Sequence, residues 1–99
     1  MAWIVVEGHD CPRQTIALDK PFRIGRVDDN DLVIRSVMIS RHHVRFEPTA
    51  EGWQVVDAGS TSGFYIRDER GGASRVLADG DVIQIGQVWI RFYLKDPPP

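Results

Sequence analysis

The stretch that decides the fold is a run of thirteen residues, Val82-Ile-Gln-Ile-Gly86-Gln87-Val88-Trp-Ile-Arg-Phe-Tyr-Leu94. Apolar and polar side chains alternate along both halves of the run, a period of two that is typical of a half-buried β-strand. The Gly86-Gln87 pair between the halves has the length of a two-residue hairpin turn. We therefore expect a β-hairpin whose second strand faces the core through Val88, Ile90, Phe92 and Leu94.

The same alternation recurs along the chain, and no window carries the i, i+3, i+4, i+7 apolar stripe of an amphipathic helix. Turn-forming residues separate the apolar runs. The expected strands are Trp3–Glu7, Gln14–Leu18, Phe22–Gly25, Leu32–Ile34, His43–Glu47, Trp53–Asp57, Phe64–Ile66, Val76–Leu77, Val82–Ile85 and Val88–Leu94. This many short strands in 99 residues predict an all-β sandwich of mainly antiparallel strands.

Length and composition predict one small module. A chain of 99 residues has room for a single core, which we assign to residues 1–95, with the proline-rich residues 96–99 as a tail or the start of a linker. The one cysteine, Cys11, excludes an internal disulfide and fits a reducing, cytoplasmic compartment. No apolar run is long enough for a signal peptide or a membrane span, so we expect no direct membrane insertion.

The charge balance disfavours one class of partner. Twelve basic residues stand against fourteen acidic ones, a net charge of −2, which is not the balance of a protein that binds nucleic acid by bulk attraction. Ten of the twelve basic residues are arginine, however, and the planar guanidinium binds carboxylate or phosphate in bidentate fashion. If the protein recognises an anion, a few placed arginines do it.

Three loops carry the polar groups that could form a site: Arg26–Asp31, Arg35–His42 and Ala58–Gly63. Strands that simply run up and down would place the last two loops at one end of the sandwich and the first at the other. The conflict is small, because the strand Leu32–Ile34 spans only about 10 Å at about 3.3 Å per residue. Together the loops offer two guanidinia, several hydroxyls and glycine-flanked amides, a set that suits a single phosphate group.

Four separated motifs resemble the forkhead-associated (FHA) domain: Phe-Arg-Ile-Gly-Arg at 22–26, Asn-Asp-Leu at 30–32, Ser-Arg-His-His-Val at 40–44 and Asp-Ala-Gly-Ser-Thr-Ser-Gly at 57–63. The resemblance runs from about Phe22 to Tyr93 and covers most of the chain. It implies a β-sandwich of about eleven strands whose loops converge at one end and bind phosphothreonine peptides of partner proteins.

The resemblance also implies residue roles. Arg26 contacts the phosphate or the peptide backbone beside it, the Ser40 hydroxyl donates to a phosphate oxygen, and Arg41 adds a second charged contact. Thr61 helps to bind the phosphate. The supporting residues are Gly25, His43 and Gly63, with His43 holding the loop in shape.

One position departs from the family pattern. Ser62 stands where the family usually has asparagine, whose amide can bond the peptide backbone as donor and acceptor, whereas serine offers a single hydroxyl. We expect this change to cost about 1 kcal/mol, a several-fold weakening. Val37 and Met38 lie where the family selects side chains downstream of the phosphothreonine, and they predict an apolar preference there.

The sequence also allows purely structural roles for these residues. Arg26 could pair with an acid of its own loop, and Ser40 and Thr61 could be turn residues that bond their own backbone. His43 is most simply a buried, hydrogen-bonded histidine. A hydrolase triad of Ser40, His43 and Asp57 is weighed and disfavoured, because the serine does not lie on a strand-to-helix nucleophile elbow.

The expected function is therefore a non-enzymatic reader of phosphothreonine in a Ser/Thr kinase pathway. We expect a monomeric domain joined to a larger protein, with no cofactor. We also expect no metal, because the His9-Asp10-Cys11 cluster lacks the ligand spacing of a zinc site. The alternative is an interaction domain that docks without phosphate through the outward-facing Trp89 and Tyr93.

Overall fold

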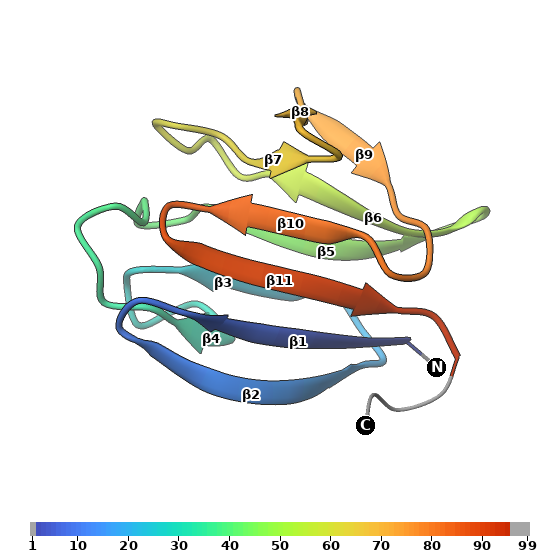
Figure 1. Cartoon of the computed structure of the whole chain (residues 1–99), viewed down its shortest axis with the longest axis horizontal. Helices are drawn as coiled ribbons and strands as arrows, with labels where there is room; N and C mark the ends of the chain where they lie inside the picture. Colours follow the sequence, from blue (N-terminus) through green and yellow to red (C-terminus); the bar gives the residue numbers. More distant parts are fainter. Residues whose placement is uncertain (1, 96–99) are drawn as a thin grey trace.

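The computed structural model describes residues 2–95, and these residues form a sandwich of eleven short β-strands (Figure 1). The strands are β1 Ala2–Gly8, β2 Cys11–Leu18, β3 Phe22–Gly25, β4 Leu32–Val33, β5 Val44–Thr49, β6 Gly52–Asp57, β7 Tyr65–Ile66, β8 Glu69–Arg70, β9 Ser74–Val76, β10 Val82–Ile85 and β11 Val88–Tyr93. The predicted all-β sandwich is confirmed. No helix in residues 2–95 is long and apolar enough to cross a membrane, and the proline-rich tail at 96–99 lies outside the described residues.

Two sheets pack face to face. The first has six strands in the order β2-β1-β11-β10-β7-β8, and the second has five in the order β4-β3-β5-β6-β9. The core between them contains Phe46, Phe64 and Phe92, each 1% exposed or less, surrounded by isoleucine and valine side chains. Two polar residues of the described chain are buried with them, Asn30 and His43.

The hairpin β10–β11 has the register that its sequence predicts. Ile85 lies opposite Val88 across the Gly86-Gln87 turn, where Gly86 takes a φ of 55°, a left-handed conformation that favours glycine. Along β11 the side chains of Val88, Ile90 and Phe92 are buried, as predicted. Leu94 differs from the prediction, because β11 ends at Tyr93 and the leucine is exposed.

Some strand boundaries also differ from the predicted ones. β2 begins at Cys11, three residues early, and a bulge between Val6 and Gly8 accommodates the extra length. β8 was not predicted, and β9 begins two residues before the predicted Val76. Strands of two or three residues are too short to display a period in the sequence.

β3 and β4 pair in parallel, and this resolves the placement of the first loop. After Gly25 the chain turns back until the Asp31 N–H donates to the Arg23 carbonyl (2.9 Å), and β4 then runs in the same direction as β3. The loops that follow β3, β4 and β6 therefore lie at one end of the sandwich, on the left in Figure 1, together with the β10–β11 turn. β1 begins and β11 ends at the opposite end.

Gly71 packs tightly against a core side chain, and this contact allows a test of the packing. A Cβ atom at Gly71 would lie 1.8 Å from the ring of Phe64, which is fully buried. We expect Gly71→Ala to lower the free energy of unfolding by about 1–3 kcal/mol, the usual cost of overpacking. In a Phe64→Leu background, where the ring is gone, the added cost of Gly71→Ala should be smaller. Urea unfolding of the four proteins measures this coupling, and strict additivity would contradict it.

Candidate functional site

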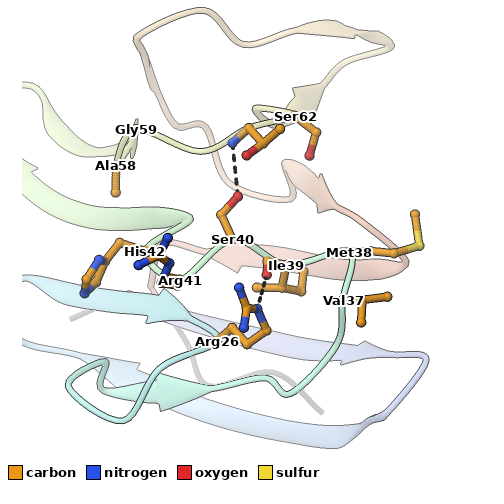
Figure 2. A pocket seen from close by; sticks show the side chains of 11 residues that line it. Arg26, Val37, Met38, Ile39, Ser40, Arg41, His42, Ala58, Gly59 and Ser62 are labelled. Atoms are coloured by element: carbon orange, nitrogen blue, oxygen red, sulfur yellow. Dashed lines mark hydrogen bonds between the residues drawn. The ribbon is translucent and has the colours of Figure 1, made fainter.

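The loops after β3, β4 and β6 enclose a hollow of about 670 Å³ at the end of the sandwich (Figure 2). Seven residues were predicted from the sequence to contact the ligand or set selectivity, and all seven line this hollow: Arg26, Val37, Met38, Ser40, Arg41, Thr61 and Ser62. Three segments that are far apart in the sequence thus contribute to one surface. The remaining assigned residues, Gly25, His43 and Gly63, do not line it, and Gly25 and His43 are buried.

Arg26 is held at the end of β3 by the second loop. Its Nε donates to the Ile39 carbonyl at 3.0 Å, and its backbone N–H donates to the Ser40 and Arg41 carbonyls (3.0 and 3.1 Å). The acids of its own loop pair elsewhere: Asp28 with Arg35, Asp29 with His42 and Asp31 with Arg23. Arg26 takes part in none of the ion pairs of residues 2–95, so its charge faces the hollow without a carboxylate.

Arg41 is a second guanidinium in the same hollow. Its side chain is exposed, and it forms no ion pair with any other residue that the structure describes. Two arginine side chains that line one hollow without an ion-pair partner attract an anion, because the guanidinium is only weakly hydrated and binds oxyanions well.

Ser40 connects the second loop to the third. Its Oγ accepts the backbone N–H of Thr61 at 3.0 Å, which leaves the hydroxyl proton free to donate (Figure 2). The Thr61 side chain is exposed at the rim. Hydroxyl donors therefore stand beside the two guanidinia, the combination that binds phosphate oxygens.

His43 holds both of these loops from inside the core. Its Nδ1 accepts the Ser40 N–H at 3.0 Å, and its Nε2 donates to the Gly63 carbonyl at 2.7 Å. Because a backbone N–H can only donate, Nδ1 is the unprotonated nitrogen of the ring. Gly63 has a φ of 73°, a conformation open to glycine, so its carbonyl can face the imidazole.

Asp57 shapes the third loop. Its Oδ1 accepts the backbone N–H groups of Gly59 (3.1 Å) and Ser60 (2.8 Å). Partial burial alone would raise the pKa of this carboxyl, but the hydrogen bonds from Ser60 and Gly59 outweigh it and hold the pKa below its ordinary value. The ionised form of Asp57 is therefore the one that stabilises the loop.

Gly25 and Asn30 tie the first loop to the second. The Asn30 amide donates to the Val27 carbonyl (2.8 Å) and to the Arg41 carbonyl (2.9 Å). A Cβ at position 25 would lie 2.2 Å from the same Arg41 carbonyl, so the backbones are in direct contact there. The role of Asn30 was not predicted from the sequence, although the residue lies in the Asn-Asp-Leu motif.

The hydrogen bonds of Ser40, His43 and Asp57 are not those of a hydrolase triad. Ser40 Oγ bonds to Thr61, both ring nitrogens of His43 bond to backbone groups, and Asp57 bonds to its own loop. A triad needs a hydrogen bond from the nucleophile to the base, and the described residues do not form one.

A sequence model of the FHA domain matches residues 22–86, about two thirds of the chain. Among curated proteins, the chain is 43% identical over 70 residues to the ABC transporter ATP-binding/permease protein Rv1747 of Mycobacterium tuberculosis. It is 41% identical over 76 residues to the glycogen accumulation regulator GarA of Mycolicibacterium smegmatis. The matches cover 71% and 76% of this chain, but 8% and 48% of those proteins.

Solved structures share the fold. The FHA domain of FhaA, solved in complex with the intracellular domain of Rv3910, superposes with a TM-score of 0.80 at 25% identity, covering 93% of this chain and 99% of that one. EmbR of Mycobacterium tuberculosis, solved in complex with a low-affinity phosphopeptide, gives a TM-score of 0.80 at 26% identity and covers 98% of this chain and 26% of that one.

The buried amide of Asn30 yields a test of how the loops are fastened. Asn30→Ala removes two hydrogen bonds and should cost about 1–3 kcal/mol of unfolding free energy. Asn30→Asp should cost more, because it turns a carboxylate toward the Val27 and Arg41 carbonyls in place of a donor. Urea unfolding at neutral pH compares the two variants, and an aspartate variant as stable as the alanine variant would contradict this account.

Asp57 makes stability depend on pH. A carboxyl with a lowered folded-state pKa contributes stability that is fully present above its unfolded pKa of about 3.9 and is lost as pH falls through the folded value. Asp57→Asn should therefore be less stable than the unchanged protein at pH 7, and the gap should begin to shrink below about pH 3.9 and close as the pH falls through the lower folded-state pKa. Urea unfolding across that range measures the gap. A gap that stays constant with pH would show that the charge of Asp57 does not stabilise the loop.

Proposed function

The chain belongs to the FHA domain family, and we propose that its hollow binds a phosphothreonine residue of a partner protein. The binding recruits that partner after a Ser/Thr kinase has modified it. The observation that carries the proposal is the pair of guanidinia, Arg26 and Arg41, that face the hollow while the acids near Arg26 are paired elsewhere. A phosphate with a charge of about −1.5 to −2 at pH 7 suits such a site.

Two kinds of group make the proposed phosphate contacts. Arg26 and Arg41 supply charge, and the hydroxyls of Ser40 and Thr61 supply directed donors. Charge-assisted hydrogen bonds contribute about 1.5–3 kcal/mol each, so a few of them account for a dissociation constant near the micromolar range, about −8 kcal/mol.

The residues around the phosphate site determine which peptide sequences next to the phosphothreonine bind best. Val37, which is 99% exposed, and Met38 stand on the rim, where an apolar side chain of the peptide can cover them. Ser62 takes the place of the peptide-clamping asparagine and holds the main chain of the ligand more weakly.

The relatives support a regulatory role. They include a glycogen accumulation regulator, a transcriptional regulatory protein and an oxoglutarate dehydrogenase inhibitor. EmbR, a transcriptional regulatory protein, has been solved with a phosphopeptide. We propose that this domain likewise acts by binding, not by catalysis, and that it does so in the cytoplasm. A phosphate-independent docking role for the Trp89 and Tyr93 face is the less favoured candidate.

The first test is phosphate-dependent binding. A degenerate phosphothreonine peptide library should bind, and the same library without phosphate should not. Arg26→Ala and Ser40→Ala should each weaken binding about tenfold or more, because each removes a charge-assisted contact. Arg91→Ala, an exposed arginine on β11, is the matched control and should leave binding unchanged. Equal binding of both libraries, measured by fluorescence anisotropy, would refute the proposal and favour the docking role.

The departure at position 62 offers a gain-of-function test. Ser62→Asn restores a side chain with both donor and acceptor groups, so it should tighten phosphopeptide binding several-fold, about 1 kcal/mol. Titration of a selected phosphothreonine peptide measures the change. An affinity that is unchanged or weaker would mean that this loop does not hold the peptide main chain.

A further inference from the structure

The phosphate site does not end at the loops. A second hollow of about 290 Å³ shares Met38 and Ser62 with it and reaches the β10–β11 turn at Gly86. A third, of about 530 Å³, shares Tyr65 and Gln84 with the second and extends to Trp89 on the outer face of the six-stranded sheet. The depressions therefore form a continuous track from the phosphate site onto the sheet.

The floor of this track is one row of residues across three strands. Tyr65 on β7 lies opposite Gln84 on β10, and Gln84 lies opposite Trp89 on β11. Tyr65 is 43% exposed and Trp89 is 45% exposed, whereas Gln84 between them is half-buried and donates its amide to the Gly86 carbonyl at 3.1 Å. Two aromatic rings thus flank a shallow amide floor, and at about 4.8 Å between strands the row is about 10 Å long.

Arg70 lies beside the track, next to Tyr65, although it lines none of the three hollows. It lies opposite Tyr65 on β8, with its guanidinium carbon 5.7 Å from the centre of the tyrosine ring. Its Nη2 is 3.4 Å from the Ser62 carbonyl at the rim of the phosphate site. Arg70 forms no ion pair within residues 2–95, and the neighbouring Glu69 pairs with Arg75. A positive charge without an ion-pair partner therefore lies at the edge of the track, beside its exposed aromatic surface.

We propose that the same phosphorylated partner occupies this track. The part of its chain adjoining the phosphothreonine crosses from the loops onto the outer face of the six-stranded sheet. It places an acidic side chain at Arg70 and an apolar or aromatic side chain between Tyr65 and Trp89. This inference rests on the proposed function, and it assigns to the partner a longer recognition segment than the loops alone can read.

Three observations favour this occupant. The depressions are continuous with the phosphate site, the unpaired Arg70 complements a carboxylate, and the exposed rings suit an apolar side chain. An extended peptide rises about 3.3 Å per residue, so about three residues span the row from Tyr65 to Trp89. A partner segment of ordinary length therefore reaches both sites at once.

The test compares long and short ligands. A degenerate phosphothreonine library with about ten residues on each side of the phosphothreonine is long enough to cross the sheet at about 3.3 Å per residue. A selected peptide is then prepared at full length and in a form truncated close to the phosphothreonine. We expect the full-length peptide to bind about tenfold more tightly, and selected sequences to carry an acidic and an apolar residue at fixed distances from the phosphate.

Variants separate the sheet from the loops. Trp89→Ala and Tyr65→Ala should each reduce the advantage of the long peptide and leave the short peptide unaffected. The short peptide thus also reports that each of these two variants is folded. Arg70→Gln should also reduce that advantage. Val76→Ala, an exposed aliphatic residue on β9 of the other sheet, is the matched control and should change neither affinity.

Each other outcome overturns the inference in a distinguishable way. If the short peptide binds as tightly as the long one, or Trp89→Ala leaves the advantage intact, the track is not part of the recognition surface while the proposed function stands. If neither phosphopeptide binds, the proposed function fails and this inference fails with it. If Trp89→Ala instead converts a dimer to a monomer in sedimentation, the face binds a second copy of the chain.

Discussion

The imidazole of His43 joins two loops through the core, with one nitrogen on the Ser40 N–H and the other on the Gly63 carbonyl. The position of the Ser40 hydroxyl depends on this pair of bonds, and through that hydroxyl so does the position of Thr61. Asn30 fastens the remaining loop in the same manner, from a buried side chain to backbone carbonyls. Rigid placement of ligand-binding groups on loops requires fastening of this kind.

The positive potential of the site depends on which groups the nearby carboxylates pair with. The chain as a whole is slightly acidic, yet the acids near Arg26 are each paired with another side chain, and Asp57 is bonded to backbone amides. The hollow therefore keeps two positive charges in a protein whose net charge is −2. A local field, not the total charge, governs which anion is attracted.

Much of the fold could be predicted because long alternating runs such as Val88–Tyr93 carry a clear period. The two-residue strand β8 could not, since it has no period to display. The parallel pairing of β3 and β4 was not predicted from the residues, because pairing direction depends on contacts distant in sequence. For the site, loop residues with distinctive chemistry were found and gather in one hollow. Asn30 and Arg70 were missed, because an amide or a guanidinium acquires its role only from neighbours that folding supplies.

The loops are held together by backbone carbonyls and amides, by two buried side chains and by the close contact at Gly25, whereas Val37 and Met38 on the rim are exposed. The groups that stabilise the loops are thus different from the side chains that we expect to select the peptide. Rim side chains can be exchanged without loosening the scaffold that displays them, much as hypervariable positions change on a constant framework. Mutations at the rim can therefore change the ligand without unfolding the domain. For the same reason, the rim is the place to randomise when sensors for modified proteins are built on this domain.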